Sequence, residues 1–321
     1  MSLWKLRFSI LGTLAVIIGL STLFFAVILS LAGVSLLLLP FIVVTFNIVQ
    51  WLVAPYLIDA MYRVKEVKKS EDPVLYGMVE RLSEKSGIKM PRIMKANIPL
   101  PNAFAYGSPI AGSRVAVTKG LLETLKPEEV EAVIGHELGH LKHRDVQAMM
   151  FVSILPAIFY YVGYSMLLSS MFGRRNERGG TAALIGVASI LVYWVLTLFT
   201  LHLSRLREYF ADRHSASIVE GGSRKLSQAL AKIAHSTSRM KKIRRDTNAF
   251  NSFKALFISD PDHAELDSVS LGRMEAHATD QKLVDEILNK KLTTFDRVME
   301  LFSTHPHIVK RLKALQGLIS S

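Results

Sequence analysis

Residues 130–145 read VEAVIGHELGHLKHRD and contain the pattern H-E-x-x-H at His136, Glu137 and His140. On a helix, two histidines four residues apart lie on one face, where both imidazoles can bind the same Zn²⁺ ion. Glu137 lies beside them, in position to act as a base on a water at that ion. The pattern therefore predicts a metal-dependent hydrolytic site. The alternative is two surface histidines on an amphipathic helix.

The residues around this pattern support a helix independently of the histidines. Pro127 suits a first helical position, and the glutamates that follow it complement the positive end of the helix dipole. An apolar stripe with spacings of four, four and three residues comes next, formed by Val130, Ile134, Leu138 and Leu141. Because this stripe points away from the histidine face, the helix can bury it and still direct both imidazoles into a cleft.

A catalytic zinc site needs a third protein ligand. The metzincins place Gly three residues and His six residues after the second histidine, but here His143 and Val146 occupy those positions, which excludes that class. A better candidate lies at residues 206–212, where Glu208 and Asp212 are one helical turn apart. We expect Glu208 to complete the ligand set. We expect Asp212 to accept a hydrogen bond from a ligand histidine and fix its tautomer.

The composition indicates a membrane protein. Of the 321 residues, 50% are hydrophobic and only 21% are charged, and the mean hydropathy is +0.29, which is more apolar than an ordinary soluble domain. The net charge of +12 comes without a basic and aromatic nucleic-acid-binding motif. We therefore expect a lipid bilayer and no nucleic acid among the partners. The absence of cysteine excludes disulfides, thiol catalysis and cysteine-ligated zinc.

The N-terminal part predicts a pair of membrane helices. No charged residue occurs from Phe8 to Ile58, which is too long for one crossing and suits two, with the turn at residues 32–35. Basic residues flank both ends of this run: Lys5, Arg7, Arg63, Lys65, Lys68 and Lys69. By the positive-inside rule, both ends are expected in the cytoplasm.

Two further apolar runs, at residues 146–172 and 181–203, are each long enough to span a bilayer. The linker 173–180 contains three arginines against one glutamate, which the positive-inside rule disfavours outside the cell. We expect two crossings, and the alternative is a hairpin packed on the protein or lying partly in the membrane. Because Val146 follows His140 by only six residues and Glu208 follows Leu203 by five, we also expect both ligand-bearing helices to continue directly into the apolar runs.

Short strands are expected at residues 92–98 and 113–117. Between them, Asn102, Ala103 and Phe104 belong to a segment that can form an edge strand, onto which a peptide adds through main-chain hydrogen bonds. The alternative is an ordinary strand with a buried Phe104.

Four segments together resemble the HtpX-type membrane metallopeptidases, which are related to the CAAX prenyl proteases. They are HELGHLKHRD, REYFADRHSA, PNAFAYG and THPHIVKRL. The resemblance implies a zinc-dependent endopeptidase with one Zn²⁺ per chain, anchored in the cell membrane with its active site in the cytoplasm. It implies polypeptide substrates, misfolded membrane proteins among them. It also implies that Asn102, Ala103 and Phe104 line the cleft, and that His305 folds back toward the site to assist catalysis.

We therefore expect a mainly α-helical membrane protein, with transmembrane helices plus an α+β, gluzincin-type zinc metalloprotease domain that contains a small sheet. The expected divisions are a transmembrane hairpin (1–62), the first part of the catalytic domain (63–145), a second hydrophobic hairpin (146–203) and the second part of the catalytic domain (204–321).

Three alternatives to this function are a CAAX-type prenyl-peptide protease, an intramembrane protease and a non-catalytic membrane scaffold. The prenyl-peptide proteases share these motifs, but the related enzymes enclose a chamber with more spans than this chain supplies. Charged residues within three turns before His136 place the start of the metal helix in water, which argues against an intramembrane protease.

Overall fold

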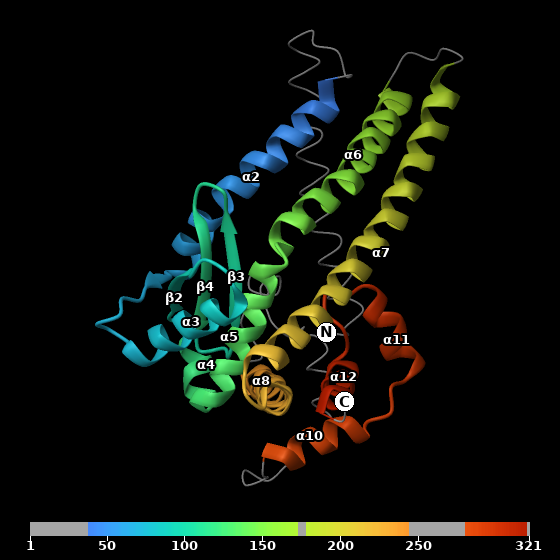
Figure 1. Cartoon of the computed structure of the whole chain (residues 1–321). Coiled ribbons are helices and arrows are strands. Elements are labelled where there is room, and N and C mark those ends of the chain that lie inside the picture. The colour runs from blue at the N-terminus through green and yellow to red at the C-terminus, as the bar shows by residue number, and fades with distance from the viewer. Residues whose placement is uncertain (1–37, 173–177, 244–279, 320–321) are drawn as a thin grey trace. The chain divides into compact units, whose positions relative to one another are not determined.

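The computed structural model describes residues 38–172, 178–243 and 280–319. Within these ranges the protein is mainly helical with one small sheet, which confirms the expected fold class (Figure 1). The chain forms two compact units. The helical unit comprises the residues up to Trp51 together with Met149–Thr200, and the sheet unit comprises Leu52–Ala148 together with the residues from Leu201 onward.

Three long apolar helices supply the helical unit: α2 (Leu39–Tyr62), α6 (Asp145–Phe172) and α7 (Arg178–Ile218). Each is long and apolar enough to cross a membrane, and both runs of the expected second hairpin are among them. The first half of the expected N-terminal hairpin, its turn, and residues 173–177 of the linker lie outside the described residues.

The sheet unit surrounds a four-stranded mixed sheet with strand order β1-β2-β4-β3. The strands β2 and β4 are parallel, and β3 pairs with β4 in the antiparallel sense, so β3 lies at an edge. Its elements in chain order are β1 (Lys65–Glu66), α3 (Pro73–Ser86), β2 (Arg92–Ala96), β3 (Ala103–Ser108), β4 (Gly112–Thr118), α4 (Lys119–Thr124), α5 (Pro127–Lys142), α8 (Gly222–Ile243), α10 (Asp280–Asn289), α11 (Thr294–Leu301) and α12 (Ile308–Ile319).

The apolar face of α5 lies in the main core of the sheet unit. Val130, Ile134 and Leu138 of the predicted stripe are buried there, together with residues of α3, α8 and α12. Lys126 donates its backbone N–H to Glu129, which in turn caps the first turn of α5, and Pro127 occupies the first helical position as expected. The helix that carries the histidines is therefore capped at its start and buried from Glu129 to Gly139, apart from the partly buried Glu131.

The expectation that both ligand-bearing helices continue into the apolar runs is confirmed for Glu208, since α7 runs unbroken from Arg178 to Ile218, and is wrong for α5. The helix α5 ends at Lys142, and α6 begins separately at Asp145. Between them Arg144 has a φ of 54°, in the left-handed region, which no α-helix can continue through. This break turns the carboxylate of Asp145 back toward the end of α5.

A close approach of α5 and α7 determines the position of Glu208 and Asp212. A Cβ atom added to Gly139 would lie 3.0 Å from the Cα of Ala211, and one added to Gly135 would lie 3.1 Å from the Oγ of Ser215. The Ser215 hydroxyl also donates to the carbonyl of Ala132 at 2.6 Å. Small residues four apart on both helices therefore allow the two backbones to pack at short range.

The edge strand is fastened to the end of α2. Arg114 of β4 is only 2% exposed and forms an ion pair with Asp59. The hydroxyl of Tyr106, on β3, donates to the same carboxylate at 2.6 Å. Both β3 and β4 are thus attached to the last turns of α2 through the carboxylate of Asp59.

We predict that Gly139→Ala lowers the thermal unfolding temperature of the detergent-solubilised protein. Alanine favours a helix by about 1 kcal/mol over glycine, but forcing a methyl group into a packed interface typically costs about 1 to 3 kcal/mol. The matched control is Gly77→Ala in α3, where an added Cβ meets nothing within 4 Å. The control variant should be at least as stable as the wild type. Equal stabilisation by both substitutions would contradict the close-packing argument.

Candidate metal centre

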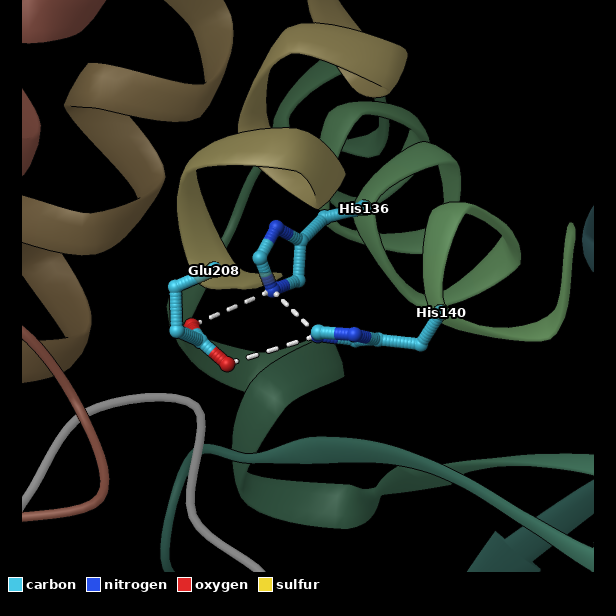
Figure 2. A group of neighbouring side chains, drawn as sticks. All are labelled: His136, His140 and Glu208. Carbon is cyan, nitrogen blue, oxygen red and sulfur yellow. Dashed lines mark hydrogen bonds and ion pairs between the residues drawn. The ribbon is translucent and has the colours of Figure 1, made fainter. Parts of the chain in front are cut away.

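The structure brings together the three predicted ligands in the sheet unit. The Nε2 atoms of His136 and His140 are 3.2 Å apart, and the Oε1 of Glu208 lies 3.4 Å from the Nε2 of His140 (Figure 2). The other oxygen of Glu208, Oε2, lies 3.6 Å from the Nε2 of His136. His136 and His140 come from α5 and Glu208 comes from α7, so the cluster depends on the packing of these two helices.

Both imidazoles are oriented by carboxylates on their far side. The Nδ1 of His136 lies 2.9 Å from Oδ1 of Asp212, and the Nδ1 of His140 is hydrogen-bonded to Oδ2 of Asp145 at 2.6 Å. Because a carboxylate can only accept, the Nδ1 that faces it is the nitrogen suited to carry a proton, which leaves Nε2 free to bind an ion when the ring is neutral. The two Nε2 lone pairs then face each other, an arrangement that a cation between them stabilises.

The three donor groups lie close enough together to share one small ion. Zinc binds nitrogen and oxygen at about 2.0 to 2.1 Å, so two ligand atoms on one ion are about 3.4 Å apart in a tetrahedral site. Here the two Nε2 atoms are 3.2 Å apart, and each lies 3.4 or 3.6 Å from a different oxygen of Glu208. One ligand atom from each of the three residues lies within 4.8 Å of the others. His136, His140 and Glu208 are therefore suited to hold one metal ion and to leave a fourth position for another ligand.

The electrostatics of the cluster also favour a cation. Burial lowers the pKa of His140, but the hydrogen bonds to Asp145 and Glu208 outweigh burial and raise this pKa to about 10. The carboxylates thus stabilise positive charge at this point. A bound metal ion would supply that charge and leave the imidazoles neutral, as ligands must be.

Two arginines hold the surrounding carboxylates, and sequence reasoning assigned a role to neither. Arg311 of α12 donates to both oxygens of Asp212, at 2.9 and 2.6 Å, and lies 3.0 Å from Oε2 of Glu208. Arg207 lies 2.9 Å from Asp145. Arg311 could have been found from the sequence, because it lies in the segment THPHIVKRL that carries part of the resemblance described above. Asp145 and Arg207 lie within the two conspicuous segments, 130–145 and 206–212, but their ion pair depends on the break between α5 and α6 at Arg144.

Glu137 points toward the edge strand. It is 3% exposed, its Oε2 accepts the backbone N–H of Ala105 at 2.7 Å, and burial raises its pKa. In an antiparallel strand, the backbone groups of alternate residues point to the same side. Thr118 and Asn102 exchange hydrogen bonds across β4 and β3, so the strand turns the backbone of Ala103 and Ala105 to its outer side.

The other predicted site residues also lie near this cluster. The side chains of Ala103 and Phe104 are buried in the two cores on either side of the sheet, and Asn102 is buried as well. Only main-chain groups of this segment can therefore contact a peptide. The Nε2 of His305 lies 3.6 Å from Oε1 of Glu208, so the C-terminal segment does fold back to the cluster.

We predict that Asp145→Asn weakens metal binding about 10- to 100-fold, because outer partners of ligand histidines typically have effects of this size. The amide keeps the shape of the side chain but loses its negative charge. Metal affinity measured by competition with a chelator tests this, with Asp285→Asn on the exposed face of α10 as the control. An unchanged affinity for Asp145→Asn would remove Asp145 from the site.

The sequence is similar to known proteins along most of its length, and residues 69–319 match the profile of peptidase family M48. A Protease HtpX homolog from Thermoplasma acidophilum is 37% identical over 297 residues, 90% of this chain and 88% of that protein. The one from Aeropyrum pernix is 36% identical over 317 residues, 97% of this chain and 96% of that protein. The crystal structure of S. mikatae Ste24p has a similar fold, with a TM-score of 0.57 at 17% identity, and the match covers 97% of this chain but only 66% of Ste24p.

Proposed function

We propose, starting from the fact that this chain belongs to peptidase family M48, that its metal is one zinc ion held by His136, His140 and Glu208. The resemblance to HtpX-type peptidases is confirmed, and the chain is a membrane metalloprotease. The observation that carries the zinc assignment is the pair of facing Nε2 atoms, 3.2 Å apart and beside a carboxylate. Two imidazoles and one carboxylate are a ligand set of catalytic zinc.

The proposed reaction is hydrolysis of a peptide bond. Zinc at such a site lowers the pKa of a coordinated water toward about 7 and polarises a carbonyl oxygen. Glu137 takes the proton of the attacking water and delivers it to the leaving amine. Its hydrogen bond from Ala105 holds the carboxylate in one orientation. Asp145 and Asp212 keep both imidazoles in the tautomer that offers Nε2.

The proposed substrate lies along the outer side of β3. An extended peptide can add to this edge through the main-chain groups of Ala103 and the carbonyl of Ala105, whose N–H is held by Glu137. Phe104 and Asn102 hold the strand from within. Main-chain recognition carries little sequence specificity, which suits an enzyme that degrades misfolded membrane proteins. The candidate spans and the flanking basic residues support a multi-pass cell-membrane protein with its catalytic unit in the cytoplasm.

The variants Glu137→Gln and Glu208→Gln should distinguish the proposed role of Glu137 as general base from that of Glu208 as metal ligand. We expect Glu137→Gln to abolish cleavage of a casein-type substrate and keep stoichiometric zinc, because a general base is not a ligand. Glu208→Gln should lose both zinc and activity, because an amide is a poor ligand for this ion. Zinc content by elemental analysis and cleavage of the same purified samples give both readouts.

Full zinc occupancy in Glu208→Gln would contradict the ligand set, and substantial cleavage by Glu137→Gln would contradict the role of the base. A prenylated peptide cleaved in preference to casein would instead indicate a prenyl-peptide protease. Failure of the wild type to cleave either substrate with zinc bound would support a scaffold.

His305 is proposed to donate a hydrogen bond to the oxygen that becomes negative during attack on the carbonyl. Removal of such a donor typically costs about 100- to 1000-fold in turnover. His305→Ala should therefore lose kcat with KM and zinc content nearly unchanged, and Lys313→Ala, at an exposed position of α12, should behave as the wild type. A fully active, zinc-loaded His305→Ala enzyme would leave His305 as a residue that only holds the C-terminal segment.

A further inference from the structure

The short helix α11 buries both of its acidic side chains and exposes all of its apolar side chains except Met299. Four side chains, each more than a third exposed, form what we call the α11 apolar face: Phe295, Val298, Leu301 and the adjoining Phe302. Asp296 and Glu300, on the opposite side, are only 5% and 6% exposed. A helix that packs on a protein in water has the reverse arrangement. The outward environment of α11 is therefore expected to be apolar.

The two buried carboxylates of α11 both have hydrogen-bond or ion-pair partners. Asp296 accepts hydrogen bonds from the backbone N–H and the hydroxyl of Thr293, both at 2.8 Å. Glu300 accepts from the backbone N–H of His307 at 3.2 Å and pairs with Lys310. These contacts fix the rotation of the helix, so the α11 apolar face cannot turn inward without breaking them.

Arg205 of α7 fastens the end of α11 to α7. One guanidinium nitrogen, Nη1, donates to the carbonyls of Glu300 and Ser303, both at 2.8 Å, and to that of Leu301 at 3.2 Å. Arg205 follows the last residue of the charge-free run 181–203 by only two positions. At 1.5 Å per residue, this anchor lies about 3 Å along α7 from the end of the lipid-compatible run.

The apolar surface of α7 continues past that point. Phe199, Leu206 and Phe210 are 69%, 41% and 58% exposed. Their spacings of seven and four residues place them on one side of the helix. A lipid-compatible surface therefore extends along α7 at the level where α11 is attached.

We propose that the α11 apolar face lies in the headgroup region of the lipid bilayer, next to the place where α7 leaves it. Eight residues form a helix about 12 Å long, which suits a helix lying at the membrane surface and not one crossing it. Lys291 and Arg297 are exposed near its N-terminal end and suit anionic headgroups. Continuity with the α7 span is the reason to assign lipid and not a protein partner.

This contact would connect the bilayer with the active site. Ser303, whose carbonyl is held by Arg205, lies two residues before His305. A helix anchored in the headgroups therefore steadies the segment that brings His305 to Glu208, and this last step rests on the role proposed above for His305. The lipid contact itself does not depend on the peptidase reaction and can be tested without it.

Single cysteines test the proposal, because the chain contains none. Val298→Cys and Leu301→Cys in the full-length protein, labelled with NBD, are reconstituted in vesicles of phosphatidylcholine and phosphatidylglycerol. We expect blue-shifted emission, several-fold weaker quenching by aqueous iodide than at a control position, and strong quenching by lipids with a nitroxide near the headgroup. The control is Asp285→Cys, exposed on α10, which should show the opposite pattern.

Two results would overturn the proposal. Iodide quenching at positions 298 and 301 as strong as at 285 would place the face in water. Protection from iodide without quenching by the nitroxide lipids would mean that protein, such as a second copy or a substrate, covers it. Retained cleavage of a soluble peptide in detergent verifies that each labelled variant is folded, and Phe295→Cys replaces any variant that fails this check.

Discussion

The short distance between α5 and α7 is the constraint on which the site depends. Gly135 and Gly139 lie four residues apart on one helix and meet Ser215 and Ala211, also four apart, on the other. Because the glycines have no side chains, the two backbones can approach each other. The histidines of α5 and Glu208 of α7 then lie close together beside this contact. The second variable position of the motif H-E-x-x-H, Gly139, therefore has a structural role, because its contact with Ala211 determines how far Glu208 lies from the two histidines.

Charge balance then determines what the converging groups can hold. Glu137, Glu208, Asp145 and Asp212 contribute four carboxylates. The buried guanidinium group of Arg311 and the partly buried one of Arg207 contribute two positive charges. With neutral imidazoles, the remaining charge of about minus two matches one divalent cation. Desolvated charges are costly unless paired, so this arrangement explains why the cluster and its ion belong together.

The local parts of this structure were predictable from sequence, and the long-range parts were not. The spacing of His136 and His140 and that of Glu208 and Asp212 each follow from one helical turn. The role of Asp145 depends on the left-handed Arg144, which no periodicity signals, and that break also overturned the expected continuous helix. The pairing of Arg311 with Asp212 joins residues 99 positions apart.

The origin of the three ligands on two separate helices has a thermodynamic consequence. Glu208 follows His140 by 68 residues, so closing the loop between them costs the chain entropy, and only the folded protein keeps the ligands together. Since the unfolded chain offers no such assembled site, binding free energy becomes folding free energy. Each tenfold rise in free metal above the dissociation constant then adds about 1.4 kcal/mol to apparent stability. The ion is therefore a reversible cross-link of the fold as well as a reagent.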